Sequence, residues 1–165
     1  MVSINAVDTP IGKLWVAVSE EGVIRLALPT SEEQAHFRAW IARYHPGAKE
    51  SKAETHTVGR ELTEYFAGRR QVFTVPLDLR GSDFQRAVWR AVAQIPYGQT
   101  ATYAALARKI GRPRAVRAVG AANGANPTPI IIPCHRVIGM NGSLVGYGGG
   151  LALKKWLLEL EGALG

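Results

Sequence analysis

The sequence of 165 residues contains a single cysteine, Cys134. One thiol cannot form an intramolecular disulfide, and thiolate zinc sites need several clustered Cys and His ligands. The histidines of the first half, His36, His45 and His56, lie singly and are interpreted as surface or packing residues. We therefore expect a free thiol, and we expect neither a metal site nor a cofactor.

Long apolar runs are also missing. None approaches the roughly 20 residues that a membrane-spanning helix needs. The first residues, MVSINAVDTPIGKLW, lack the basic and apolar regions of a signal peptide. With 47% hydrophobic and 20% charged residues and no biased tract, the composition is that of a globular domain. We expect a cytoplasmic protein that does not bind membranes.

Acidic residues are scarce relative to basic ones, 13 against 20, which gives a net charge of +7. Such an excess favours an anionic partner, nucleic acid first, although many basic surfaces are merely solvated. The excess is concentrated in residues 82–120, where Asp83 is the only acid. The basic residues of this stretch are Arg86, Arg90, Arg108, Lys109, Arg112, Arg114 and Arg117.

The first half is predicted to be a small α/β domain, residues 1–75, with an antiparallel sheet. Alternating and β-branched residues around a turn glycine predict a hairpin, and apolar residues at helical spacing predict two helices. The expected elements are strands at Lys13–Ser19 and Gly22–Leu28, helices at Ser31–Pro46 and Thr55–Arg70, and an extended segment at Val72–Gly81. Residues 76–81 are predicted to be a linker.

The second half, residues 82–165, is predicted to be mostly helical, so that the whole chain is a two-part α/β (α+β) protein. Ser82 and Asp83 are typical of a helix start, and two short helices joined by a glycine-containing turn are typical of a helix-turn-helix. One helix is expected to begin at Ser82. Three more are expected at Thr100–Gly111, Arg112–Gly124 and Leu151–Gly162, and Pro113 is expected in the first turn of the helix Arg112–Gly124.

The second helix of this pair, Arg112–Gly124, has very small side chains: Ala115, Ala118, Gly120, Ala121, Ala122 and Gly124. A helix that reads the major groove presents Arg, Asn or Gln to the base edges, whereas a small-residue helix can approach a narrow groove closely. We expect DNA binding without sequence reading. The alternative is a helix packed tightly against a neighbour.

The stretch NPTPIIIPCHRVIG, residues 126–139, places the thiol at the end of an apolar run that is predicted to be a buried strand up to Pro133. A lone buried cysteine is most often a small core residue. A nearby imidazole or guanidinium lowers the thiol pKa from about 8.5 and produces the reactive thiolate. His135 and Arg136 are the candidates, but neighbours on a strand face opposite ways, so His135 needs a bend or a bridging water to act.

These motifs closely resemble those of the O6-alkylguanine-DNA alkyltransferases, also called methylated-DNA–protein-cysteine methyltransferases. The resemblance rests on IPCHRVIG, the NP upstream, the GYGGG and WLLELE downstream, and the order and spacing of IPYGQTATYAALA and RAVGAANGANP. It covers the chain from about GSDFQRAVW to the C-terminus. The first half fits the small α/β domain of the family less specifically.

The resemblance implies direct-reversal DNA repair. The alkyl group of O6-alkylguanine, and of O4-methylthymine in many members, would move irreversibly to Cys134 of the same chain, once and without a cofactor. The partner would be double-stranded DNA, bound through its minor groove with little sequence specificity and with the damaged base flipped out. The protein would be a monomer in solution that could assemble cooperatively on DNA.

The resemblance also assigns roles to individual residues. Cys134 matches the alkyl acceptor, His135 the base that acts through a water, and Glu161 the acid that orients His135, with Glu159 as the nearby alternative. Asn126 matches the hinge asparagine, and Tyr103 the phenol that protonates the leaving guanine. The expected DNA contacts are Arg117, which would enter the duplex, Thr102, Arg114, Ala118, Ala121 and Ala122; the expected pocket residues are Pro129, Val137, Tyr147 and Gly148.

Gly148 departs from the family pattern, since many members carry a small hydroxyl residue there. We expect the missing side chain to leave room for larger alkyl groups. Two other interpretations of the chain stay open at this point. One is a lesion-binding protein without transfer activity, a group that commonly has tryptophan in place of the cysteine. The other is a helix-turn-helix regulator with an inert core thiol.

Overall fold

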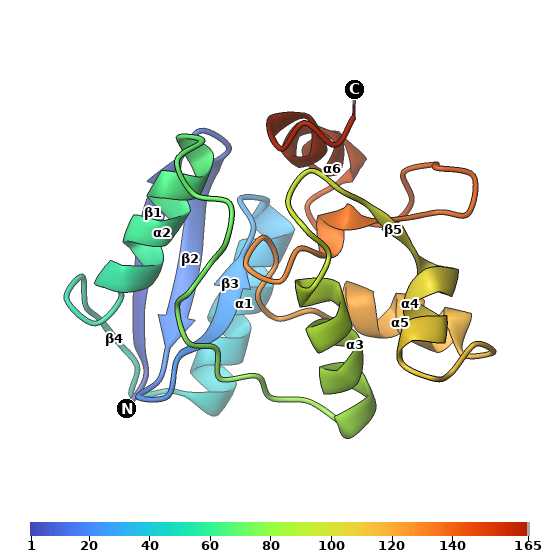
Figure 1. Cartoon of the computed structure of the whole chain (residues 1–165). Coiled ribbons are helices and arrows are strands. Elements are labelled where there is room, and N and C mark those ends of the chain that lie inside the picture. Colours follow the sequence, from blue (N-terminus) through green and yellow to red (C-terminus); the bar gives the residue numbers. More distant parts are fainter. Residues whose placement is uncertain (165) are drawn as a thin grey trace. The chain divides into compact units, whose positions relative to one another are not determined.

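Four strands form the sheet of the first unit, Met1–Leu79, in the order β3-β2-β1-β4 (Figure 1). β1 (Ser3–Thr9) pairs antiparallel with β2 (Gly12–Val18), and β2 pairs antiparallel with β3 (Val23–Ala27). β4 (Lys49–Glu50) adds a short parallel edge. The predicted hairpin is confirmed as β2 and β3, whereas β1 was not predicted. Its sequence SINAVDT carries Asn and Asp, which are depleted in strands. The structure describes residues 1–164.

Two helices cover opposite faces of this sheet. Phe37 of α1 (Ser31–Tyr44) packs in a cluster with Val2 and Ala17. Gly59 of α2 (His56–Phe66) faces Val7, whose side chain points away from that cluster because strand residues alternate. Both helices end before the predicted boundary. His45 precedes a proline, and residues before proline disfavour helical backbone.

The segment after α2 runs back to the sheet, in agreement with its predicted extended form. Leu77 forms a single parallel bridge with Val23, and Val23 N donates to Pro76 O at 2.9 Å. Gly22 lies so close to this segment that an added Cβ would be 2.5 Å from Pro76 O. Glycine is therefore needed at this turn, where φ is +151°.

The second unit, from Arg80 on, contains four α-helices in its described part. They are α3 (Asp83–Ala93), α4 (Tyr103–Lys109), α5 (Val116–Gly124) and α6 (Leu151–Leu160). Ser82 and Gln85 form a full capping box at the start of α3, as the Ser-Asp pair indicated. α4 packs against α5, as a helix-turn-helix requires. Pro113 lies in the turn before α5 rather than in its first turn, which corrects the predicted start.

The predicted strand before Cys134 is wrong. The chain instead makes a tight turn, in which Ile132 N donates to Thr128 O at 2.9 Å and buried Ile130 has φ +75°. Prolines remove three backbone donors from residues 127–133, so this stretch cannot build a strand ladder. A 3₁₀ helix, η1 (Cys134–Arg136), follows. A branched residue with positive φ is strained, and such strain gathers at functional sites.

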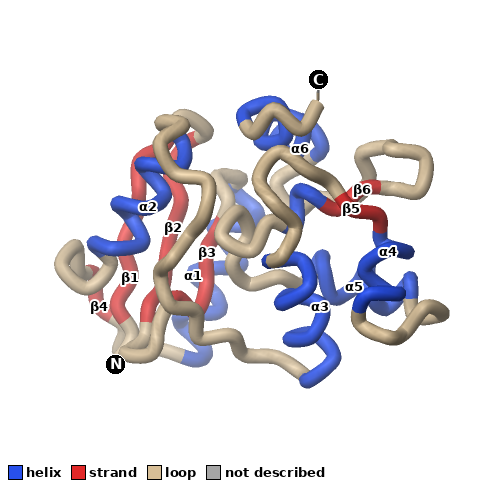
Figure 2. Tube along the Cα trace, in the orientation of Figure 1, coloured by secondary structure: helices blue, strands red, loops and turns tan. Residues whose placement is uncertain are grey.

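Two very short strands join α4 to the segment after η1. β5 (Ala101–Thr102) pairs parallel with β6 (Val137–Ile138), and Figure 2 shows the pair as the link between the two segments. After β6 the chain makes the predicted turn at Asn141-Gly142, with Gly142 at φ +75°, but no second strand follows. No helix in the described part of the chain is long and apolar enough to cross a bilayer.

Candidate functional site

Cys134 is the first residue of η1 and is 7% exposed. Its backbone N donates to Ile132 O at 2.7 Å, and its carbonyl oxygen accepts from Asn123 Nδ2 at 3.4 Å. Side chains of a 3₁₀ helix are spread at three residues per turn, so consecutive residues do not simply face opposite ways. In a strand, Cys134 and His135 would face opposite ways and could not act together directly. Because the two residues lie in a 3₁₀ helix instead, this restriction does not apply.

His135 and Glu161 meet, with 2.8 Å between Nε2 and Oε2 and both side chains fully buried. Burial lowers the pKa of His135, and this effect outweighs the opposing influence of Glu161. The imidazole is accordingly neutral near pH 7. The hydrogen bond to Glu161 fixes the proton on Nε2, which leaves Nδ1 as the acceptor. Nδ1 is buried and has no hydrogen-bond partner among the described residues.

Arg136 binds the same carboxylate through two hydrogen bonds. Its Nε donates to Glu161 Oε1 at 2.7 Å and its Nη2 to Oε2 at 3.0 Å, while Nη1 reaches Ile95 O at 2.7 Å. The guanidinium also lies over the ring of Tyr97, 5.6 Å from its centroid. A buried carboxylate needs such compensation because desolvation of a charge is costly. Arg136 is a member of this cluster that the sequence did not assign.

Glu161 rather than Glu159 is the acid of this cluster. Glu161 is the C-cap residue of α6 and is buried, whereas Glu159 is exposed and pairs with Lys155 at 3.7 Å. In the sequence, an acidic residue at a helix end that is followed by Gly162 is typical of a solvated side chain. The choice between Glu161 and Glu159 could therefore be made only from the structure.

Tyr103 lies at the start of α4, which the β5–β6 pair brings to the segment after η1. Its hydroxyl donates to Val145 O at 3.3 Å. Burial raises the pKa of Tyr103, a hydrogen bond from Asn123 opposes this, and a negative charge on Cys134 raises it further. The phenol therefore keeps its proton when the thiol is ionised.

Lys154 of α6 is a second buried cation that sequence analysis missed. Its Nζ donates to Val137 O at 2.6 Å, Val145 O at 2.8 Å and Gly146 O at 3.2 Å, so it ties the glycine-rich loop 139–150 to β6. Burial lowers its pKa, and a negative charge on Cys134 raises it. Its spacing of three and seven residues from Leu157 and Glu161 places it on the inner face of α6 and could have revealed it.

The apolar spacing of Leu153, Trp156, Leu157 and Leu160 predicts an amphipathic helix; α6 is amphipathic, but its inner face differs from this prediction. Trp156, predicted as an apolar contact, is 37% exposed, while Leu158 and Lys154 are buried. The observed inner face of α6 is rotated from the predicted one by about one residue position, which corresponds to about 100° around the helix axis.

The expected pocket residues lie on both sides of η1. Pro129 and Val137 are buried, and the ring of Tyr147 stands edge-on to that of His135 with centroids 6.5 Å apart. Gly148 follows Tyr147 in the loop and is exposed. Asn126 ties the turn before Cys134 together, since Nδ2 donates to Ile132 O at 2.8 Å and Oδ1 accepts from Thr128 N at 3.0 Å.

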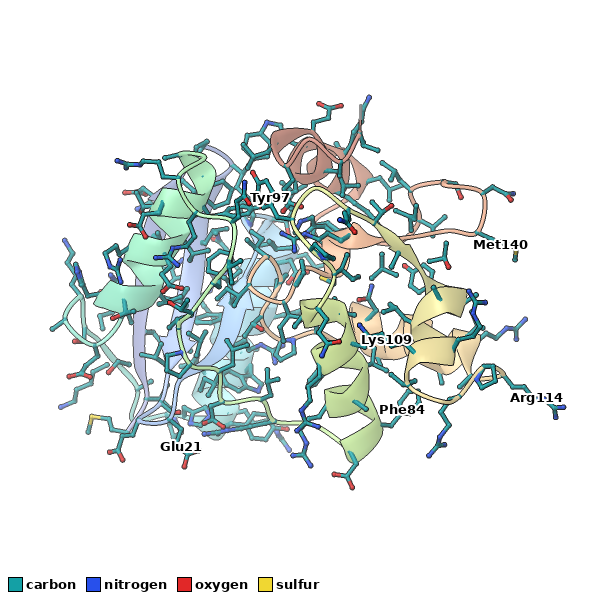
Figure 3. All side chains as sticks on the ribbon, viewed as in Figure 1. Glu21, Phe84, Tyr97, Lys109, Arg114 and Met140 are labelled. Atoms are coloured by element: carbon teal, nitrogen blue, oxygen red, sulfur yellow. The ribbon has the colours of Figure 1, made fainter. Side chains whose placement is uncertain are left out.

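The expected DNA contacts fall into two groups. Arg114, Arg117, Ala118 and Ala121 are exposed, and Figure 3 shows Arg114 projecting outward from the turn before α5. Ala122 is buried, with its carbonyl oxygen accepting from Trp89 Nε1 at 2.8 Å, so its side chain does not share the outer face. Helical periodicity explains this, because Ala122 follows Val119 by three residues on the inner side. Thr102 caps α4 by accepting from Ala105 N at 3.1 Å.

Among residues 1–164 no group of three or more His, Cys, Asp or Glu side chains is arranged to hold a metal ion.

Both halves of the chain match models of one family. Residues 4–79 match the ribonuclease-like domain of 6-O-methylguanine DNA methyltransferase, and residues 83–163 match its DNA binding domain.

Individual relatives agree with these models. The inducible methylated-DNA–protein-cysteine methyltransferase of Bacillus subtilis is 52% identical over 89% of this chain and 83% of its own length. The methylated-DNA–protein-cysteine methyltransferase of Mycolicibacterium paratuberculosis is 45% identical over 98% of this chain and 93% of its own. The crystal structure of Mycobacterium tuberculosis OGT in complex with DNA matches with a TM-score of 0.85 and 44% identity, over 98% of this chain and 93% of that one. The chain belongs to the 6-O-methylguanine DNA methyltransferase family.

Proposed function

We propose that this protein repairs alkylated DNA by moving the alkyl group from O6 of guanine, and from O4 of thymine, to Sγ of Cys134. The observation that carries the proposal is the position of the one thiol directly before the buried His135. The imidazole of His135 is hydrogen-bonded to Glu161, and the charge of this buried carboxylate is balanced by Arg136. The names of the relatives, methylated-DNA–protein-cysteine methyltransferases, support the same chemistry.

The first step is ionisation of the thiol. Nδ1 of neutral His135 is the free acceptor of the ring, and a water between it and Sγ would carry the proton from Cys134 to the imidazole. Glu161 stabilises the imidazolium that forms, and the Lys154 ammonium favours the thiolate electrostatically. A thiolate is the soft nucleophile that displacement at an alkyl carbon needs.

The second step is displacement. The bond from Sγ to the alkyl carbon forms as the bond from that carbon to O6 breaks, and the electron pair leaves with guanine. The Tyr103 hydroxyl gives its proton to a ring nitrogen of the departing base, which therefore leaves neutral. The proton lost by Cys134 makes good the loss from Tyr103, so that over the whole reaction one proton moves from thiol to guanine. Because a thioether is not hydrolysed, each chain acts once and needs no cofactor.

DNA binding is assigned to the exposed face of α5 together with the turn before it. Arg114, Arg117, Ala118 and Ala121 present positive charge and very small side chains, which suits close approach to a minor groove without base reading. The target atom of a paired guanine is inaccessible, so the base must be flipped out, and Arg117 would fill the space that it leaves. The relative solved in complex with DNA supports duplex DNA as the partner. We propose that the protein is a monomer in solution. Cooperative assembly on DNA would be detected as a sigmoidal dependence of DNA binding on protein concentration.

The decisive experiment is intact-protein mass spectrometry. Wild-type protein and Cys134→Ser are incubated with a slight excess of duplex carrying one O6-methylguanine. The expected result is a stoichiometric gain of one methylene on wild type, located at Cys134 by peptide mapping and absent from the variant. Lesion-preferring binding with no gain of mass would overturn the proposal and place the protein among non-catalytic lesion-binding proteins.

Gly148 is proposed to widen the range of alkyl groups. Gly148 is exposed and follows Tyr147 in the chain, and a hydroxyl residue at this position would occupy room that glycine leaves open. Wild type is expected to react faster than Gly148→Ser with O6-benzylguanine in duplex DNA, while the two react alike with O6-methylguanine. Equal rates with the benzyl substrate would refute this assignment.

A further inference from the structure

The turn that follows α3 packs against the end of α6, and Tyr97, labelled in Figure 3, is one of its two central residues. Gln99 N donates to Pro96 O at 3.0 Å and Gly98 has φ +82°, as in a type II turn. A Cβ built on Gly98 would lie 3.3 Å from Glu161 O, so the turn and the last residue of this helix are in close contact.

The ring of Tyr97 covers the flat face of the Arg136 guanidinium. The guanidinium carbon lies 5.6 Å from the ring centroid, and the tyrosine hydroxyl donates to Leu160 O at 3.4 Å. The edges of the guanidinium are already occupied by hydrogen bonds to the Glu161 carboxylate and to Ile95 O. Arg136 is 5% exposed, whereas Tyr97 is only half-buried. The ring therefore separates this face of the guanidinium from water.

The orientation of the Glu161 carboxylate decides which nitrogen of His135 carries the proton. Oε2 accepts from His135 Nε2 at 2.8 Å, which leaves Nδ1 to accept the thiol proton. The two bonds from Arg136, to Oε1 and Oε2, fix the plane of the carboxylate because a bidentate pair allows little rotation. Water that reached the guanidinium would compete for these bonds, and the carboxylate could then turn away from Nε2.

We propose that Tyr97 is a positioning residue for alkyl transfer: its ring holds Arg136 on Glu161 and thereby keeps His135 in the tautomer that accepts the thiol proton. A cation over an aromatic ring is attracted to the π-system, and the attraction is strongest where water is excluded. The inference rests on the proposed function, in which His135 is the base. Tyr97 acts in this role through Arg136 and Glu161 and not on the reacting atoms.

The first test is single-turnover transfer from an O6-methylguanine duplex at saturating DNA. Tyr97→Leu removes the ring, and Tyr97→Phe keeps the ring and removes only the hydroxyl. The range of cation–π energies corresponds to about 3-fold to 30-fold in an equilibrium constant, so a loss of this size is expected in Tyr97→Leu. Tyr97→Phe should lose less than about twofold. The affinity for the duplex, measured by fluorescence anisotropy, should be equal in all three proteins.

Tyr44→Leu is the matched control. Arg43 lies over the ring of Tyr44, 5.4 Å from its centroid, but Tyr44 is 59% exposed and belongs to the first unit. This substitution removes a cation–π contact of similar length, and the transfer rate should stay within about twofold of wild type because the contact is solvated.

The second test reads the tautomer of His135 by ¹⁵N NMR of the imidazole rings and needs no DNA. His135→Gln identifies the signal by its absence. Wild type and Tyr97→Phe are expected to carry the proton on Nε2, whereas Tyr97→Leu should show a share of the form with the proton on Nδ1. A ring that only fills space would lower the urea midpoint on replacement without changing this signal in folded molecules.

A double-mutant cycle tests whether Tyr97 acts through Arg136. In the Arg136→Met background, Tyr97→Leu should change the transfer rate by less than about twofold, since the ring then has no cation to hold. If Arg136→Met does not fold, the NMR comparison of Tyr97→Leu with Tyr97→Phe decides alone.

Four outcomes overturn the inference: an unchanged transfer rate in Tyr97→Leu, an equal loss in Tyr97→Phe, an unchanged His135 tautomer, or an equal loss in the Arg136→Met background. Failure of the proposed function looks different, because wild type itself would gain no methyl group from DNA. In that case the NMR comparison still decides whether the ring of Tyr97 controls the imidazole.

Discussion

In the first unit the buried polar residues among those described are Ser3, Thr55 and Glu61, whereas the second unit buries Asn123, Thr128, His135, Arg136, Lys154 and Glu161. Of the Asp, Glu, His, Lys and Arg side chains, the first unit thus buries one and the second unit four. The single carboxylate of the first unit is satisfied locally: Glu61 accepts from Thr74 N at 2.8 Å, Val75 N at 3.0 Å and Thr74 Oγ1 at 2.6 Å. It fastens a returning segment to α2, and an ion pair with Arg70 at 3.7 Å connects it to the partly exposed Glu64.

Two of these four side chains, His135 and Arg136, follow the thiol directly in η1, and Glu161 binds both of them. The fourth, Lys154, interacts electrostatically with Cys134. Burying charge costs free energy even when the charge is paired, and apolar residues of similar size are often as stable or more so. Such a cluster is therefore weak as a stabilising device. What it supplies is a fixed arrangement of proton acceptors, donors and positive charge around Cys134. The comparison teaches that a buried polar group has to be judged by its partners, because Glu61 and Glu161 are equally hidden.

The largest effect is expected for Glu161→Gln. Arg136 would lose its carboxylate and remain buried as an unpaired charge, which costs about 3–5 kcal/mol in the free energy of unfolding. The transfer rate should also fall, since His135 loses the acceptor that orients it. Urea unfolding and single-turnover kinetics measure the two effects. Glu159→Gln on the same helix, where the side chain is 52% exposed, is the matched control and should behave as wild type. Equal losses in both variants would refute the distinction.

A smaller effect is expected for Lys154→Met. The variant removes the lysine donor of the buried Val137 carbonyl oxygen and one of the two donors of the Val145 carbonyl oxygen, at a cost of about 1–3 kcal/mol. Burial lowers the pKa of Lys154, so the unfolded chain binds this proton more tightly than the folded one. Wild-type stability should therefore rise with pH from the lowered folded pKa up to the ordinary lysine value of about 10.4.

Lys154→Met should lack this rise, and the difference can be read from urea midpoints at a series of alkaline pH values. Lys155→Met, where the side chain is 63% exposed, is the control and should keep the pH dependence of wild type. A rise of equal size in Lys154→Met would show that another group produces it.

In the first unit, Glu61→Gln is expected to cost about 1–2 kcal/mol of stability, since hydrogen bonds to a charged group are lost. Burial alone would raise the pKa of Glu61, but the bonds from Thr74 and Val75 and the charge of Arg70 outweigh it and lower the value. Wild type should therefore lose this contribution as pH falls below the ordinary carboxyl range through the lowered pKa, and the variant should not. Alkyl transfer per folded molecule should be unchanged. A slower transfer would show that the buried carboxylate of the first unit also serves the reaction.

Sequence reasoning found the elements whose cause is local. Ser82 with Asp83 predicted the start of α3 correctly, and Gly22 predicted the hairpin turn, because caps and turns act within a few residues. It failed before Cys134, where Ile130, Ile131 and Ile132 indicated a strand. The neighbouring prolines and the side chain of Asn126 decide that region, and the bonds of Asn126 span up to six residues.

For the site, sequence and resemblance named Cys134, His135, Glu161 and Tyr103, but considered Arg136 only for its effect on the thiol pKa and did not name Lys154. Arg136 and Lys154 act through contacts 25 and 17 residues away in the chain, with Glu161 and the Val137 carbonyl. No local pattern contains such distances. Ala122 was placed on the wrong face because composition counts small residues without regard to helical phase.

The smallest effect is expected for Arg86→Ala, also in the second unit. Arg86 Nη2 lies 2.6 Å from Asp83 Oδ1, a shorter contact than any that Arg136 makes, yet these side chains are 35% and 99% exposed. Water already solvates both charges, so the pair adds little Coulomb energy and restrains two side chains. The urea midpoint should not differ measurably from wild type at low or high salt. A loss of stability approaching that of Glu161→Gln would mean that charged residues of the second unit contribute strongly to the free energy of unfolding whether or not they are buried. An unchanged midpoint would mean that burial determines the size of this contribution.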